Sequence, residues 1–144
     1  MSKAVMPYLI EHGWGRIVNI STSLVTMQRR GYAPYGSSKW AVEGLTEIMS
    51  QDLDETNITA NVLIPGGATD TAMIPGTVGD KKRTGADGNL FEPEIMIRPI
   101  QFLCSEVSNG MSGDRYVAKL WDDSLEPLVA AKGIRFQIKR DRVY

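Results

Sequence analysis

The chain has 144 residues and a formal net charge of −1, with 42% hydrophobic and 23% charged residues. This length and composition are typical of one globular domain covering residues 1–144, and the near-neutral charge gives no electrostatic basis for binding nucleic acid or an anionic membrane. No apolar run approaches the roughly 18 residues of a membrane span, the N-terminus has no signal-peptide pattern, and His12 has no second metal ligand at a useful spacing. We therefore expect a cytoplasmic protein without a nucleic-acid partner, a membrane partner or a metal site.

The first half of the chain alternates helix and strand. Residues 2–12 are predicted to form a helix that Gly13 ends. Residues 16–21 are predicted to form a mostly apolar strand of the buried parallel kind. After a loop over 24–34, apolar residues recur at helical spacing, which predicts a long helix from about residue 35 to residue 56.

The second half continues this alternation. Residues 58–64 are predicted to form a strand, and residues 68–92 a mobile loop. A helix begun by proline is predicted over 93–105, and a third strand over 114–118. The tail from residue 122 has a mixed pattern that favours neither helix nor strand. Strands that alternate with helices imply right-handed parallel crossovers and therefore an α/β layer structure.

A tyrosine and a lysine lie four residues apart at the start of the long predicted helix. At this spacing Tyr35 and Lys39 share one helix face, one above the other. An ammonium beside a phenol stabilises the phenolate, which lets a tyrosine exchange protons near neutral pH. The pair alone is a weak signal. It gains weight because it follows a strand, a cluster of hydroxyls at Ser21, Thr22 and Ser23, and a short loop.

Several stretches in this order resemble the catalytic half of the short-chain dehydrogenase/reductase family. Residues 15–21 resemble the family's fifth strand, which ends in its catalytic serine, and residues 35–45 resemble its active-site helix. Residues 61–66 are similar to the sixth strand and the Pro-Gly turn after it. The stretches 102–105 and 113–117 are similar to the last helix and the seventh strand. The resemblance implies an α/β fold: a partial Rossmann-like, doubly wound parallel sheet of about three strands with flanking helices.

The resemblance also implies an oxidoreductase in which Tyr35 is the general acid/base and Lys39 supports it and bonds the nicotinamide ribose. The substrate-orienting hydroxyl stays open among three neighbours. The family's spacing before the tyrosine selects Thr22, whereas a one-residue loop difference would select Ser23, and serine is the family's usual residue. Because side chains alternate along a strand, Ser21 and Ser23 are expected to point one way and Thr22 the other. We slightly favour Ser23, and capping of the strand end by all three hydroxyls is the alternative.

The same resemblance implies NAD or NADP as the cofactor and a small alcohol or carbonyl compound as the substrate. Pro65 and Gly66 are similar to the family's Pro-Gly-x-x-x-Thr turn, whose backbone and threonine hydroxyl hold the nicotinamide carboxamide. Asp70 occupies the usual place of the threonine, so Thr71 is the better match and Thr69 the reserve. A plain turn that holds no ligand is the alternative.

Dinucleotide-binding folds of this kind hold the cofactor phosphates with a glycine-rich turn and bind the ribose with a further side chain. The sequence contains no counterpart of either element. The 144 residues are therefore expected to correspond to the second half of the enzyme, beginning inside the helix before its fifth strand. Two other functions follow as alternatives. One is a truncated, inactive chain that acts by associating with itself or with a full-length relative. The other is a non-catalytic ligand-binding protein.

Three remaining features give expectations about surface and core. The apolar strand at 16–21 would have an open edge, and the helices at 2–12 and 35–56 resemble those with which the family forms dimers and tetramers, so a homo-oligomer is expected. Cys104, the single cysteine, is expected on a buried helix face. The basic run at 81–83 is expected to be a solvated loop.

Overall fold

Four strands form one sheet in the computed structural model of the chain, which describes residues 1–76, 80, 83–85 and 88–137. The strand order is β1-β2-β3-β4. β1 and β3 both pair with β2 in parallel, and β4 pairs with β3 in the antiparallel direction. The strands are β1 (Gly15–Ile20), β2 (Ile58–Ile64), β3 (Asp114–Val117) and β4 (Arg135–Gln137).

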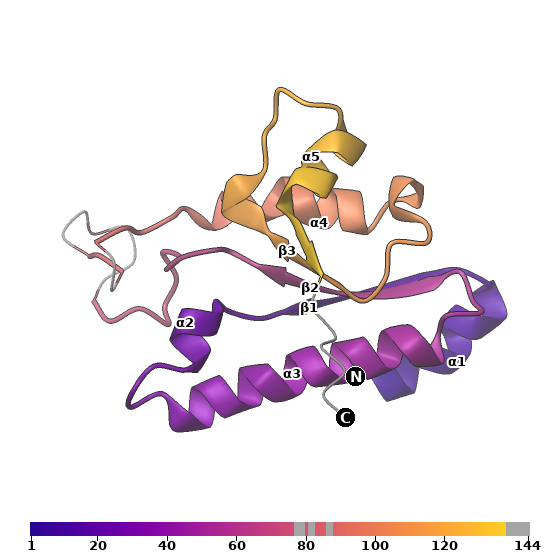
Figure 1. The fold of residues 1–144 in the computed structure, drawn as a ribbon, viewed down its shortest axis with the longest axis horizontal. Coiled ribbons are helices and arrows are strands. Elements are labelled where there is room, and N and C mark those ends of the chain that lie inside the picture. The colour runs from indigo at the N-terminus through magenta and orange to yellow at the C-terminus, as the bar shows by residue number, and fades with distance from the viewer. Residues whose placement is uncertain (77–79, 81–82, 86–87, 138–144) are drawn as a thin grey trace.

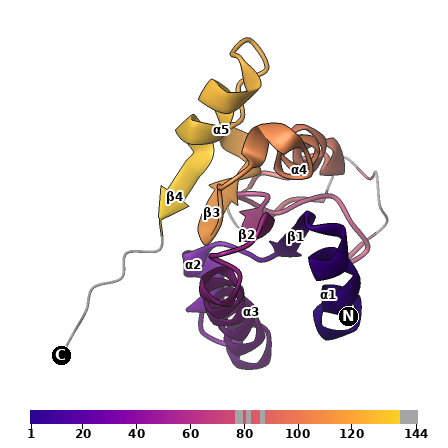
Figure 2. The ribbon, with the colours of Figure 1, turned by 90° about the vertical axis from the view of Figure 1, so that its right-hand side faces the viewer.

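Helices cover both faces of this sheet. Figures 1 and 2 show α1 and α3 on one face and α4 and α5 on the other. The α-helices are α1 (Ser2–His12), α2 (Leu24–Met27), α3 (Ala33–Asp52), α4 (Ile97–Leu103) and α5 (Pro127–Ile134). Short 3-10 turns are η1 (Pro93–Met96), η2 (Glu106–Ser108) and η3 (Ala118–Leu120). This three-layer arrangement confirms the expected α/β class, with one antiparallel strand more than the sequence indicated.

The core consists of two apolar clusters, one on each face of the sheet. β2 is buried at every position. Ile58 and Ala60 belong to one cluster and Leu63 to the other, because successive side chains of a strand point to opposite faces of the sheet. One cluster packs α1 and α3 on the sheet through Ile17, Met49, Leu53, Ile58 and Ala60. The other packs α4 and α5 through Leu63, Phe102, Leu103, Met111, Tyr116, Ala118, Ala131 and Ile134.

α3 turns a largely polar face to the sheet. Its buried residues include Glu43, Thr46 and Ser50 beside Met49. Leu45 and Ile48 are 54% and 57% exposed, although both belong to the apolar pattern that predicted the helix. Hydrogen bonds rather than apolar contacts therefore fix much of the contact between this helix and β1.

The element boundaries differ from the prediction in several places. α3 ends at Asp52 rather than at about residue 56, and the helix predicted over 93–105 consists of the 3-10 turn η1 followed by α4, which ends at Leu103. α3 begins at Ala33, before the predicted residue 35, because Pro34 in its first turn is well placed to start a helix. The predicted loop at 24–34 contains the short helix α2. The tail beyond residue 122, which had no prediction, forms α5 and β4. Among the described residues, no helix is long and apolar enough to cross a membrane.

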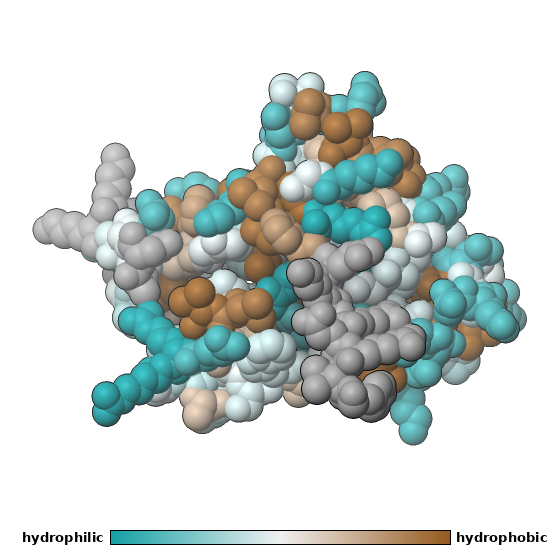
Figure 3. Space-filling model, in the orientation of Figure 1, coloured by the Kyte–Doolittle hydropathy of each residue, from teal (hydrophilic) through white to brown (hydrophobic). Residues whose placement is uncertain are grey.

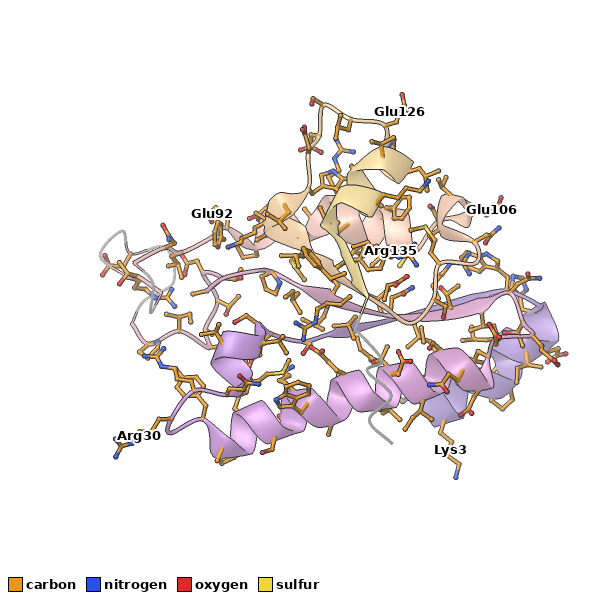
Figure 4. The ribbon with its side chains drawn as sticks, viewed as in Figure 1. Lys3, Arg30, Glu92, Glu106, Glu126 and Arg135 are labelled. Carbon is orange, nitrogen blue, oxygen red and sulfur yellow. The ribbon has the colours of Figure 1, made fainter. Side chains whose placement is uncertain are left out.

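Two expectations about burial are wrong. Cys104 is exposed, because α4 ends at Leu103 and the cysteine lies in the C-cap position beyond the buried helix face. Arg83 is buried rather than solvated. Its guanidinium pairs with Asp70 and donates to the carbonyl oxygens of Thr71, Ile74 and Pro75. Lys81 and Lys82 lie outside the described residues. By contrast, Lys3 and Arg30 point away from the body of the molecule (Figure 4).

Candidate active site

The candidate residues gather where the parallel strands end. Residues 21–23 follow β1, residues 65–67 follow β2, and residues 118–121 follow β3. Because the three strands are parallel, their carboxyl ends meet at one edge of the sheet. Ligands of open α/β sheets bind in the crevice outside this edge. The hydroxyl segment, defined as residues 21–23, and the Pro-Gly turn therefore lie at the expected place for a ligand.

The first turns of α3 bring Tyr35 and Lys39 to the same edge. The Lys39 ammonium nitrogen lies 5.7 Å from the centroid of the Tyr35 ring. It also donates a hydrogen bond of 3.0 Å to the carbonyl oxygen of Ile20, the last residue of β1. One cation thus contacts both the tyrosine ring and the strand end from which the hydroxyl segment leaves.

A glycine lets α2 approach α3 closely beside this pair. A Cβ atom added to Gly36 would lie 2.1 Å from the carbonyl oxygen of Met27, so no other residue fits there without movement. Met27 is the last residue of α2, which directly follows the hydroxyl segment. The close approach therefore places that segment against the start of α3.

The three hydroxyls have different partners. Ser21 is buried and donates a 2.6 Å hydrogen bond to the Glu43 Oε1 atom. Ser23 caps α2: its Oγ accepts from the Thr26 N–H at 3.2 Å and lies 2.9 Å from the Thr26 hydroxyl. Thr22 is half-buried between them. β1 ends at Ile20, so the alternation expected along a strand does not extend over these residues.

Sequence reasoning missed two charged residues next to this segment. Glu43 of α3 and Arg115 of β3 are both buried and form an ion pair through Glu43 Oε1. A signal for Glu43 was present, because Tyr35, Lys39 and Glu43 follow one another at four-residue intervals and so share a helix face. No local signal pointed to Arg115, which lies 72 residues further along the chain.

The Pro-Gly turn is closely packed by neighbouring side chains. Gly66 has a φ of 91°, which favours glycine, and a Cβ atom added there would lie 2.7 Å from Cγ of Lys119. A Cβ atom added to Gly67 would lie 2.4 Å from the ring of Phe91. The tight turn therefore depends on both glycines.

The two candidate threonines after the turn differ in their surroundings. The Thr69 hydroxyl oxygen is buried and has no hydrogen-bond partner among the described residues. Thr71 is exposed, and its carbonyl oxygen accepts from Arg83 at 2.7 Å. A buried hydroxyl without a partner is costly, so the site fits a ligand that supplies a hydrogen-bonding group to Thr69.

Tyr116 is a second tyrosine near the sheet, but its environment keeps it neutral. Burial raises the pKa of Tyr116, and the nearby Asp114 carboxylate raises it further. Asp114 is itself paired with Arg135, whose Nε lies 2.7 Å from Asp114 Oδ2. Tyr116 is therefore a packing residue of the apolar core. Among the described residues, no three His, Cys, Asp or Glu side chains are grouped so that they could hold a metal ion.

Comparison with known proteins identifies the family. The family model for short chain dehydrogenases matches residues 1–81, which is more than half of the chain. The match includes β1, the hydroxyl segment, the Tyr35–Lys39 pair and the Pro-Gly turn. The chain belongs to the short-chain dehydrogenase family.

Individual relatives agree with this assignment. A short-chain type dehydrogenase/reductase from Picea abies is 38% identical over 91 residues, covering 63% of this chain and 34% of that protein. The human dehydrogenase/reductase SDR family member 4 is 33% identical over 123 residues, covering 81% of this chain and 44% of that protein. Among solved structures, the chain is similar to a gluconate 5-dehydrogenase from Burkholderia cenocepacia, crystallised in complex with NADP and tartrate. The TM-score is 0.68 and the sequence identity is 30%, and the match covers 81% of this chain and 48% of that chain. The chain thus spans less than half the length of each of these proteins.

Proposed function

We propose that the chain catalyses, as an NAD- or NADP-dependent oxidoreductase, the interconversion of a small alcohol and its carbonyl compound. The observation that carries the proposal is the position of Lys39, whose ammonium contacts the Tyr35 ring and the carbonyl of Ile20 at the end of β1. This contact brings an acid/base pair to the strand end that carries the hydroxyls. Family membership supports the same chemistry.

In this reaction Tyr35 transfers the proton. Its phenol donates a proton to the carbonyl oxygen during reduction and takes it back from the alcohol during oxidation. Lys39 assists because a cation near a phenol favours the ionised form that must appear during the reaction. The nicotinamide, when bound, supplies or accepts the hydride.

We assign the substrate-orienting hydroxyl to Thr22 rather than to Ser23. The Ser23 oxygen caps α2, and the Ser21 hydroxyl is turned into the interior towards Glu43. Moving either one to a substrate would leave a helix terminus or a buried carboxylate with one hydrogen bond fewer. Thr22 neither caps α2 nor bonds to the Glu43 carboxylate, and it lies at the family's usual spacing from Tyr35.

The nicotinamide end of the cofactor would be held by Lys39, by the turn at Pro65 and Gly66, and by a threonine. Thr69 is the better candidate because its buried hydroxyl has no partner among the described residues, and Thr71 is the second choice. An amide such as the nicotinamide carboxamide offers both a donor and an acceptor for this hydroxyl.

A turnover assay tests the proposal. The chain, fused to a segment that supplies the glycine-rich phosphate turn it lacks, is purified and incubated with NADPH or NADH and a panel of small aldehydes, ketones and keto acids, the 5-keto form of gluconate included, while the loss of nicotinamide absorbance is followed. We expect turnover with at least one carbonyl compound. Tight binding of a carbonyl compound without turnover with either dinucleotide would contradict the proposal and support the non-catalytic alternatives.

A further inference from the structure

We propose that Glu43 is a positioning residue that fixes the hydroxyl segment against the helix face carrying Tyr35 and Lys39. The inference rests on the proposed function, because it assigns a role within the same site. It concerns a side chain that does not touch the substrate and acts through Ser21.

Two consecutive residues at the end of β1 are tied to two consecutive turns of α3. The Ile20 carbonyl oxygen accepts from Lys39 at 3.0 Å, and the Ser21 hydroxyl donates to Glu43 at 2.6 Å. Lys39 and Glu43 are one helical turn apart on the same face. Two hydrogen bonds therefore hold the end of β1 to α3, and together they prevent it from rotating about either bond.

Arg115 holds Glu43 from the side of the sheet. Glu43 is 3% exposed, and a buried carboxylate needs a cationic partner and hydrogen bonds. Arg115, which is 8% exposed, supplies the charge and belongs to β3, where it lies opposite Val62 of β2 and Phe136 of β4. The Glu43 carboxylate is thus held between the Arg115 guanidinium, which comes from a strand paired on both sides, and the Ser21 hydroxyl.

This attachment determines where Thr22 projects. Ser21 is held through its side chain by Glu43 and through its backbone N–H, which donates to the Leu63 carbonyl at 3.1 Å. Because the peptide unit is planar, fixing Ser21 limits the directions available to the next residue. A displacement of about 1 Å in a catalytic group can reduce the rate about 100-fold.

A second hydrogen bond between the same two elements provides a matched control. Asn19 of β1 donates to the Thr46 hydroxyl at 2.8 Å, and Thr46 donates to the Val42 carbonyl at 2.7 Å. Thr46 is 1% exposed, comparable to Ser21 at 4%. The control pair lies on the same face of β1 and α3 but does not contact the hydroxyl segment.

The experiment compares Ser21→Ala, Glu43→Ala, Glu43→Gln and Thr46→Val in the whole chain. Four quantities are measured: the denaturation midpoint, the exchange of the backbone amide hydrogen of residue 21, which is bonded to the Leu63 carbonyl, and kcat and KM with the carbonyl compound that the turnover assay identifies. We expect Ser21→Ala and Thr46→Val to lower the midpoint to a similar extent. Only Ser21→Ala and Glu43→Ala should raise amide exchange at residue 21 and lower kcat, by about 10- to 100-fold, with KM little changed. Glu43→Gln, which can still accept from Ser21, should retain more activity than Glu43→Ala.

Two results would overturn the proposal: an equal loss of kcat in Thr46→Val and Ser21→Ala, or unchanged amide exchange at residue 21 in Ser21→Ala. If the unaltered chain shows no turnover, the proposed function fails and amide exchange alone decides the positioning role. Faster exchange at residue 21 in Ser21→Ala but not in Thr46→Val would then support it, and equal exchange in both would overturn it.

Discussion

The Glu43 carboxylate and the Arg115 guanidinium form a buried ion pair that joins α3 to β3 across one face of the sheet. Removing one member of such a pair leaves the other charge buried without compensation, whereas removing both charges leaves no such penalty. The pair therefore gives a stability prediction that does not depend on catalysis.

Arg115→Met should lower the free energy of unfolding by about 3–5 kcal/mol, the usual effect of breaking a buried ion pair. The double variant Glu43→Gln/Arg115→Met should regain most of that loss, because no unpaired charge is buried. Urea denaturation of the single and double variants measures both values. A double variant as unstable as Arg115→Met would show that the arginine contributes through packing alone.

Tyr35→Phe should reduce turnover by about 10²- to 10⁴-fold, because it removes the proposed general acid/base. The fold should be retained, since the phenylalanine ring keeps the edge-on contact with Tyr32, whose ring centroid lies 6.3 Å away. Tyr32→Phe is the matched control and should keep its activity. Circular dichroism and initial rates check the two variants, and more than half of the activity remaining in Tyr35→Phe would refute the assignment.

Gly36→Ala and Gly44→Ala should have opposite effects on stability, although both glycines lie in α3. At Gly36 the new Cβ would lie 2.1 Å from the Met27 carbonyl oxygen, so α2 must move away and stability should fall. At Gly44 nothing lies within 4 Å, and alanine should stabilise the helix by up to about 1 kcal/mol. Thermal denaturation measures both; stabilisation by Gly36→Ala would contradict the close contact between α2 and α3.

Cys104 should react completely with a thiol reagent in the folded protein, because its side chain is exposed just beyond the end of α4. The modification should leave the denaturation midpoint almost unchanged. Cys104→Ser, which removes the single thiol of the chain, gives the background rate. A reaction that requires denaturant would show that the cysteine is shielded.

The chain should associate with itself in solution. Among the described residues, the outer edge of β1 has no paired strand, and Leu45 and Ile48 expose apolar surface on α3. Light scattering should give a mass above 15.9 kDa. Ile48→Glu should lower this mass more than Val129→Glu, a change at a similarly exposed residue of α5. A mass of 15.9 kDa at tens of micromolar, with a cooperative thermal transition, would count against association.

Figure 3 shows that hydrophobic side chains also gather over α2 and α5 on the face in view. Leu24 and Val25 of α2 and Val129 of α5 contribute to the exposed apolar surface. Comparing Ile48→Glu with Val129→Glu therefore distinguishes association through α3 from association through α5.

The sequence predicted the elements whose signals are local. The Pro-Gly turn correctly marked the end of β2 at Ile64, and Gly13 was correctly placed at the end of α1, where its φ of 72° and its N–H bonds to the last turn close the helix. The shared face of Tyr35 and Lys39 was also predictable, because helical spacing alone determines it.

Features that depend on distant residues could not be predicted in this way. β4 has three residues and exists through its pairing with β3, which the local pattern does not show. Glu43 reads as a surface charge until Arg115 is known to lie opposite it in the folded chain. The choice between Thr22 and Ser23 likewise depends on hydrogen bonds that form only after α2 has folded.

The arrangement of α3, which hydrogen-bonds to β1 through buried polar side chains while Leu45 and Ile48 face solvent, has a consequence for evolution. Hydrogen bonds are directional, so the bonds from Asn19 and Ser21 to the helix allow it only one rotation about its axis. Substitutions at Leu45 or Ile48 leave these bonds intact. Selection can therefore alter the outward face, and with it the molecules that the protein contacts, while Tyr35 and Lys39 keep their orientation.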